Sequence, residues 1–259
     1  MRLRSAFLVA LTLVIALPLR SHVAAPAASS RIAKLPHITV WAWERRDDLT
    51  ALDTQRAAVA QLVETITQDG PVLRVAPQRN RIYLPDHVRR MAVVRIETHQ
   101  PQLTHGTATA VARELARISW RTRGHKSGDQ LDGERALAFQ VDFDALRSER
   151  AWYRDVLTQL RTEMPQDMPL SITALASWCS ADRWMAGLPI DEAVPMLFRM
   201  EPGQRGDHNI PIREPLCAGS AGISTREDWP GNLADKRIYI FPDRGWRQDD
   251  LTQTLKALP

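Results

Sequence analysis

The chain has 259 residues, a formal net charge of +4, 25% charged residues and two cysteines. This length suits one large domain or two small ones. Three arginines, Arg2, Arg4 and Arg20, lie in an amino-terminal segment without acidic residues, so the rest of the chain is close to neutral. A near-neutral chain has no charge reason to bind a polyanion, which argues against nucleic acid as a partner.

The amino terminus has the pattern of a secretory signal peptide. After the first arginines, residues 6–19 form an uncharged apolar run, and Ala25-Pro26-Ala27 offers a cleavage site of the A-x-A type. The run is shorter than the ~20 residues that cross a bilayer, so we favour a cleaved signal peptide, residues 1–27, over a permanent anchor. No later stretch is apolar enough to span a membrane. We therefore expect a periplasmic or secreted protein, with a disordered Ala/Ser-rich leader at residues 28–36.

Residues 37–259 show no repeat or linker and are expected to form a single domain. Eight short apolar runs predict strands, several of them buried on both faces: His37–Trp43, Ala57–Thr65, Met91–Thr98, Leu137–Asp144, Leu170–Trp178, Val194–Met200, Leu216–Ser224 and Arg237–Phe241. Helical spacing predicts helices at Thr107–Ile118, Glu149–Glu163 and Asp249–Ala257.

This alternation of strands and helices predicts a parallel α/β fold. We expect an irregular (β/α)8 barrel of TIM type with some shortened or missing helices, and an open doubly wound sheet is the alternative. The segment Val72–Tyr83 contains Pro77 and Asn80 and predicts a β-hairpin insertion. No nucleotide-binding loop is present, which removes the usual reason for an open sheet.

Cys179 and Cys217 are the two cysteines. In an oxidising compartment a pair is more often bridged than free. The predicted strands place one cysteine at a strand end and the other at a strand start, which argues against a bridge. The sequence therefore leaves undecided whether the two cysteines form a disulfide. A zinc site is disfavoured because no CxxC or HxxxH spacing accompanies them.

The main candidate site is the run Gln140-Val141-Asp142-Phe143-Asp144, at the end of a predicted strand. Alternation puts Gln140, Asp142 and Asp144 on one face, and barrel enzymes keep catalytic groups at strand carboxyl ends. Two nearby carboxylates can have different pKa values, as an acid/base pair requires. The structural alternative is that Asp144 caps the next helix and Asp142 pairs with a buried arginine.

Other predicted strand ends supply partners for this pair. Glu44 is a third catalytic candidate, and the candidate substrate-binding residues, together with Gln140, are Arg95, Glu97, Trp178 and Arg199. Aromatic rings stack on the apolar faces of sugars, and hydroxyls need charged or amide partners, so this set predicts a carbohydrate site. Each residue alone also has a structural interpretation, since a strand tryptophan is usually core and an Arg–Glu pair can be buried.

The remaining residues of reactive type predict no further chemistry. The histidines have no partner at metal-ligand spacing, so no metal site and no cofactor are expected. The turn Gly219-Ser220-Ala221-Gly222 does not match the G-x-S-x-G motif of serine nucleophiles.

Five segments together resemble a bacterial exported family known as domain of unknown function 3142: residues 40–45, 95–97, 140–145, 171–179 and 195–200. The resemblance implies a glycosidase-type barrel and brings no established activity. The Asp-x-Asp run is also similar to chitinase-like barrels, in which a catalytic Glu stands two residues after the last Asp. Here that position is Leu146, which argues against chitinase-type hydrolysis.

The sequence therefore predicts an exported, glycoside hydrolase-like barrel acting on a glycan. The alternative is a non-catalytic protein that binds a glycan or another partner on the same barrel, because a fold does not determine a function.

Export is directly testable. We expect residues Met1–Ser30 to activate a reporter enzyme that works only outside the cytoplasm, because the segment carries a charged start, an apolar run and a cleavage site. The measurement is reporter activity per amount of fusion protein. A silent reporter in cells that accumulate the fusion would contradict the predicted location.

Overall fold

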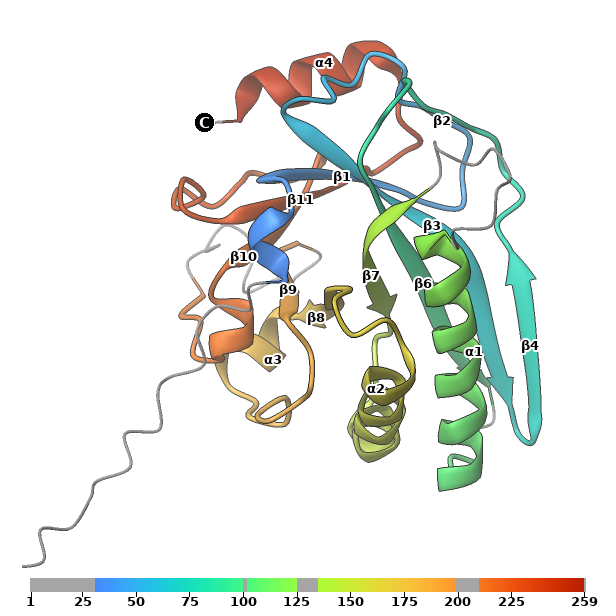
Figure 1. Cartoon of the computed structure of the whole chain (residues 1–259). Coiled ribbons are helices and arrows are strands. Elements are labelled where there is room, and N and C mark those ends of the chain that lie inside the picture. The colour runs from blue at the N-terminus through green and yellow to red at the C-terminus, as the bar shows by residue number, and fades with distance from the viewer. Residues whose placement is uncertain (1–30, 100–101, 125–134, 199–209, 259) are drawn as a thin grey trace, which may run out of the picture.

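The computed structural model describes residues 31–99, 102–124, 135–198 and 210–258. The expected signal peptide lies outside the described residues. Figure 1 shows the described chain as a set of long strands with two prominent helices, α1 (His105–Arg123) and α2 (Arg150–Glu163), side by side.

Eight parallel strands close into a barrel, which confirms the predicted barrel and overturns the open doubly wound alternative. In order around the barrel they are β1 (Ile38–Ala42), β3 (Ala57–Asp69), β6 (Arg90–His99), β7 (Ala136–Asp142), β8 (Leu170–Leu175), β9 (Glu192–Met196), β10 (Ser220–Ser224) and β11 (Arg237–Phe241). Strand β1 closes it by pairing with β3 on one side and β11 on the other.

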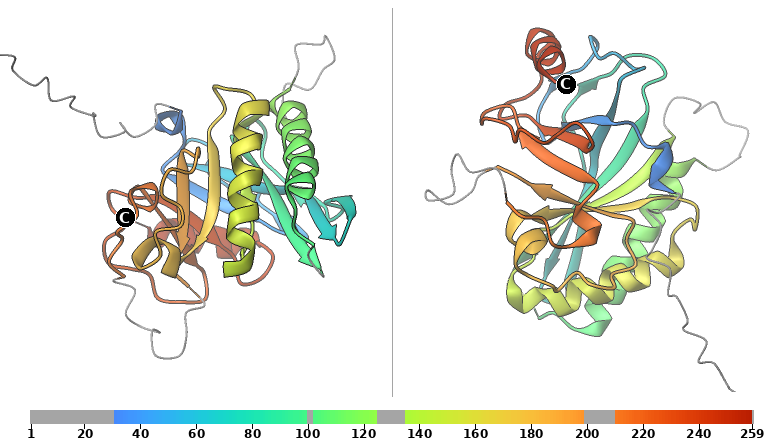
Figure 2. Two further views of the ribbon diagram at one scale, coloured as in Figure 1. Left: turned by 90° about the horizontal axis from the view of Figure 1, so that it is seen from below. Right: turned by 90° about the vertical axis from the view of Figure 1, so that its left-hand side faces the viewer.

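The helices cover the barrel unevenly. Helices α1 and α2 follow β6 and β7 and lie over one side of the barrel (Figure 2). Elsewhere the helical elements are short or terminal: η1 (Ile32–Lys34), η2 (Arg147–Glu149), α3 (Ala176–Ser180), η3 (Pro215–Cys217) and α4 (Gln248–Ala257). This agrees with the prediction that some helices are shortened or missing.

Side-chain alternation divides the core into an inside and an outside. A compact cluster that includes Trp41, Leu62, Val93 and Tyr239 lies within the barrel. Larger clusters pack outside it, one of them under α1 and α2. The register of β3 against β6 shifts between Leu62 and Glu64, so from Glu64 onward the β3 side chains exchange faces.

The predicted hairpin is wrong in detail. Strand β4 (Val72–Pro77) pairs antiparallel with the end of β3, so the hairpin turns at Gly70, which has a positive φ of 54°. The second half of the predicted hairpin, β5 (Ile82–Tyr83), instead pairs with β2 (Asp47–Asp48). The prediction failed because polar residues alternate with apolar ones after Thr65, so the strand was expected to end there. Strand β3 continues to Asp69.

The end of the predicted disordered leader has regular structure. Residues Ile32–Lys34 form η1, and Arg31 makes a 2.9 Å ion pair with the buried carboxylate of Asp191. The backbone carbonyl of Ile32 also accepts a hydrogen bond from Arg237 at 2.8 Å. These contacts attach the segment to the residue before β9 and to β11.

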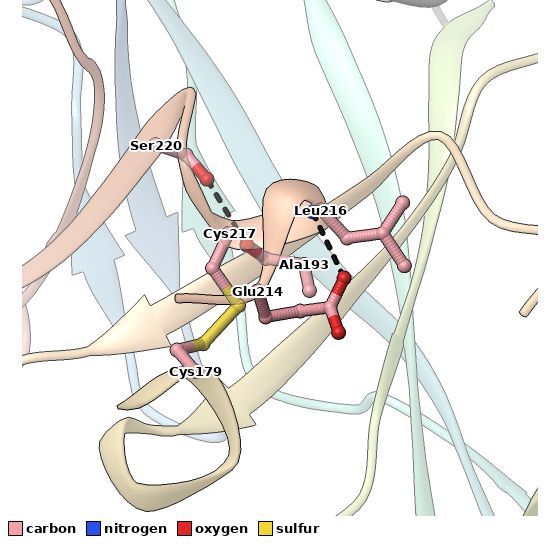
Figure 3. The surroundings of a disulfide bond; sticks show 6 residues. All are labelled: Cys179, Ala193, Glu214, Leu216, Cys217 and Ser220. Atoms are coloured by element: carbon pink, nitrogen blue, oxygen red, sulfur yellow. Dashed lines mark hydrogen bonds between the residues drawn. A yellow bond between two sulfur atoms is a disulfide. The ribbon is translucent and has the colours of Figure 1, made fainter. Parts of the chain in front are cut away.

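Cys179 and Cys217 form a disulfide, which the sequence left open (Figure 3). The strands predicted around them were too long: β8 ends at Leu175 and β10 begins at Ser220, so the cysteines lie in α3 and η3. Their Cα atoms are 5.9 Å apart, within the range for a bridge. The bridge joins the connection after β8 to the connection after β9, whose described helical segments, α3 and η3, are short.

The disulfide should contribute measurably to stability. Closing a 38-residue separation predicts a loss of about 3–4 kcal/mol in the free energy of unfolding when the bond is removed. Chemical unfolding with and without reductant measures this loss. The double variant Cys179→Ala/Cys217→Ala should show the lower stability and no response to reductant, and equal stability of both forms would contradict the prediction.

Candidate functional site

A pocket lies at the mouth of the barrel formed by the carboxyl ends of the strands. Its volume is about 220 Å³. Its walls come from β1, β6, β7, β9, β10 and β11 and the loops after them: Trp41, Trp43, Arg45, Asp47, Arg95, Asp142, Asp144, Met196, Phe198, Ser224, Phe241, Pro242, Asp243, Arg244 and Gly245. This is the end at which parallel α/β barrels hold their active sites.

Asp142 is the last residue of β7 and faces this pocket, as predicted. Its Oδ1 accepts a 2.7 Å hydrogen bond from the hydroxyl of Thr173 on β8. The pKa of Asp142 is raised to about 6, chiefly by burial and also by the nearby carboxylate of Asp144, while Thr173 and Arg95 oppose the shift. Among the residues that the structure describes, which do not include Arg199, no arginine forms an ion pair with Asp142.

Asp144 also lines the pocket but lies beyond the strand. Strand β7 ends at Asp142, so the alternation that placed both aspartates on one strand face applies only as far as Asp142. Asp144 is exposed, and its charge is close enough to influence the pKa of Asp142. Both carboxylates therefore line one pocket. Asp142 is half-buried in it, and Asp144 lies at its open edge.

Arg95 joins the pocket to the neighbouring β6 residue Glu97. Its Nε lies 3.0 Å from the Glu97 carboxylate, and both side chains are about one-third exposed. The guanidinium also lies over the ring of Trp43, 5.0 Å from the ring centre. Glu97 is not part of the pocket wall, but its charge contributes to the raised pKa of Asp142.

Aromatic rings form a continuous wall of the pocket that begins beside Arg95. Trp43 stacks on Trp41 with ring centres 5.2 Å apart, Trp41 contacts Phe241 at 4.5 Å, and Phe241 contacts Phe198 at 5.0 Å. Trp41 is buried, whereas Trp43, Phe198 and Phe241 are half-buried. Gly222 makes room for this wall, since a Cβ there would lie 3.1 Å from the Phe241 ring.

Asp47 is a pocket residue that the sequence analysis missed. It is fully buried, and its Oδ1 accepts a 2.7 Å hydrogen bond from the backbone N–H of Trp246. Burial raises the pKa of Asp47 to about 6, against the effect of backbone hydrogen bonds. Gly245 allows this contact, because a Cβ there would lie 2.7 Å from the carbonyl oxygen of Arg46. The sequence signal for Asp47 was its position after the first predicted strand, and the same signal favoured Glu44 equally.

Three of the other candidates are not in the pocket. Glu44 is exposed beyond β1, and its backbone carbonyl accepts a hydrogen bond from Asn80. Gln140 is buried inside the barrel, one layer below Asp142, where its amide donates to the hydroxyl of Ser171 at 3.0 Å. Trp178 lies in α3, outside the barrel, with its ring fully buried against Trp184.

The placement of Trp178 corrects its predicted role. The chain leaves the strand at Leu175 and turns into α3, so Trp178 belongs to the outer core rather than to a strand end. Arg199, the last of the predicted substrate-binding residues, lies outside the described residues. Phe198 and Phe241, which the sequence analysis did not select, supply the aromatic surface that Trp178 was expected to provide.

Residues 86–200 match the family model Domain of unknown function (DUF3142). The matched segment runs from the loop before β6 to the end of the β9 region, so it includes Arg95, Asp142 and Asp144. It bears out the resemblance noted from the sequence for this part of the chain. No curated protein matches the chain.

Within the described part of the chain, no group of three or more His, Cys, Asp or Glu side chains is arranged to hold a metal ion. The helices described here include none that is long and apolar enough to cross a membrane.

The raised pKa of Asp142 predicts a pH-dependent effect of the variant Asp142→Asn. Folding disfavours the charged form of Asp142. The wild type therefore loses stability as pH rises from 3.8, the ordinary pKa of this group, to about 6, its pKa in the folded protein. The asparagine keeps the acceptor for Thr173 and cannot ionise. Relative to wild type, the variant should gain up to about 3 kcal/mol in free energy of unfolding between pH 4 and pH 7.

Denaturant unfolding at both pH values measures this gain. Thr173→Val is the companion variant, because it removes a hydrogen bond that lowers the pKa of Asp142, and a carboxyl NMR titration should then give a higher value. A loss of several kcal/mol in Asp142→Asn at pH 7 would instead indicate a structural ion pair.

Proposed function

We propose that this protein is an exported glycoside hydrolase-like enzyme, with Asp142 as its general acid. The observation that carries the proposal is Asp142 itself, half-buried at the carboxyl end of β7 with a pKa of about 6. An acid with this pKa is still partly protonated near neutral pH and gives up its proton readily, as protonation of a leaving-group oxygen requires.

The surrounding groups support a sugar as the substrate. The partly exposed rings of Trp43, Phe198 and Phe241 offer apolar surface for the C–H faces of a sugar ring. Arg95 and the carboxylates of Asp142 and Asp144, which line the same pocket, offer partners for hydroxyls. A small pocket with an apolar wall and a few convergent polar groups is the usual form of a small-molecule site.

In the proposed reaction Asp142 donates its proton to the glycosidic oxygen as the bond to the sugar carbon breaks. Asp144 is the second carboxylate, and it either attacks the sugar carbon or activates a water molecule. Ionised Asp144 also favours the protonated form of Asp142, which keeps the acid ready for transfer. Glu44 has no part in this scheme, because its side chain lies outside the pocket.

The finer architectural and cellular assignments belong to the same proposal. The eight parallel strands follow chain order around the barrel, which supports a (β/α)8 barrel of TIM type that has lost several helices. The signal-like amino terminus supports a periplasmic or secreted location, and the disulfide is of the kind that persists in an oxidising compartment.

A non-catalytic glycan-binding protein is the second candidate. The aromatic wall is its supporting observation, because stacking alone can hold a sugar without any proton transfer. The two functions differ in whether Asp142 is needed for product formation or only for affinity.

A glycan-array screen followed by product analysis on each bound glycan tests the proposal. We expect Asp142→Asn to reduce the rate of hydrolysis by about 10²–10⁴-fold while the glycan still binds, because only the transferable proton is removed. The wild-type rate should fall as pH rises above about 6, as Asp142 loses that proton. Asp86→Asn, an exposed carboxylate before β6, is the matched control and should behave as wild type. Binding without any product in the wild type would favour the second candidate.

A further inference from the structure

Strands β3, β4 and β6 continue beyond the barrel mouth as a three-stranded ribbon. The last residue of β7, Asp142, pairs with Arg95, but β6 runs four residues further, to His99. Over this stretch β3 stays paired with β6 on one side and with β4 on the other. Figure 1 shows the three strands passing the end of β7 alongside α1.

One face of the ribbon is covered by α1. Ile66 and Ile96 are buried on this face and join the core under the helix. Glu64 is also buried on it, and its carboxylate lies 2.6 Å from the guanidinium of Arg121 on α1. This face therefore has an evident structural role.

The other face, here called the open face, is polar. The strand register aligns its side chains in three rows, which are Ala76, Thr65 and Arg95, then Arg74, Thr67 and Glu97, then Val72, Asp69 and His99. Thr65 and Thr67 are half-buried, and His99 is exposed. Arg74 pairs with Asp69 at 2.8 Å, with side chains 61% and 36% exposed, and such exposed ion pairs contribute little to stability.

The open face is continuous with the pocket. Arg95 lines the pocket and also begins the first row, and Glu97 in the second row is its ion-pair partner. From Arg95 to His99 the strand advances about 13 Å away from the pocket. A ligand that leaves the pocket on the β6 side therefore meets hydroxyl and charged groups at regular intervals.

The pocket alone is too small for a long ligand. Its volume of about 220 Å³ is below the roughly 300–1,000 Å³ of sites that enclose a drug-sized molecule. A sugar chain with one unit in the pocket must extend over the surface of the protein. Its hydroxyl groups require both donors and acceptors, which threonine hydroxyls and Arg–carboxylate pairs provide.

We infer that the open face binds the further sugar units of a glycan chain whose terminal or cleaved unit occupies the pocket. The inference rests on the proposed function and adds to it that the ligand is an oligosaccharide or polysaccharide rather than a free monosaccharide. Thr65 and Thr67 are the central contacts for the glycan chain, because they lie on the middle strand of the ribbon. Arg95 and Glu97 lie beside them on β6, and Arg74 lies beside them on β4.

The test compares chain lengths on an array that presents each sugar as a monosaccharide and as oligosaccharides of increasing length. The wild type should bind the longer chains more tightly than the monosaccharide. Thr65→Val/Thr67→Val keeps side-chain shape and strand propensity but removes both hydroxyls, and it should weaken oligosaccharide binding about tenfold while monosaccharide binding stays unchanged.

Val75→Thr is the matched control, because Val75 pairs with Ile66 and belongs to the other face of the ribbon. It should bind chains of every length as wild type does, and thermal melting verifies that both variants fold. Equal binding of all chain lengths, or an unaffected double variant, would overturn the inference and leave the proposed function standing. Failure to bind any sugar would overturn the proposed function itself.

Discussion

The fold depends on the hydrogen bonding of β1 along both of its edges. This five-residue strand pairs in parallel with β3 and β11, and without it the sheet would have two open edges. Closure gives every parallel strand an inside and an outside and brings all carboxyl ends to one mouth. Trp41, whose side chain fills the interior just below that mouth, lies on the same strand. Closure of the barrel and the floor of the pocket therefore depend on one short segment.

The barrel interior holds a buried or half-buried acid near each end, and the two acids have different partners. Near the amino ends of the strands, Glu192 is buried, but it pairs with Arg237 at 2.9 Å and accepts a 2.6 Å hydrogen bond from Tyr239. Near the carboxyl ends, Asp142 accepts a hydrogen bond from a threonine hydroxyl, and none of the described arginines forms an ion pair with it. The first carboxylate is compensated by an ion pair, whereas the second retains a cost of burial. This contrast separates a structural acid from a candidate functional one.

Local patterns predicted much of this arrangement. The eight strands were recognisable because branched and aromatic residues form short apolar runs, and Asp142 was recognisable as a carboxylate at the end of one of them. Trp178 misled the prediction because the same apolar run continues through Leu175 into α3, and periodicity alone does not mark where a short strand turns into a helix. Asp47 could not be identified, since its role depends on Trp246, 199 residues away in the sequence.

The bridge between Cys179 and Cys217 makes two connections of the barrel sensitive to the redox state of their surroundings. Reducing conditions keep such thiols unlinked, whereas an oxidising compartment lets the bond form and persist. Where the structure describes the connections after β8 and β9, their helical segments are the short α3 and η3. Oxidation therefore joins the two connections covalently, and reduction would free each from the other while the barrel strands keep their pairing.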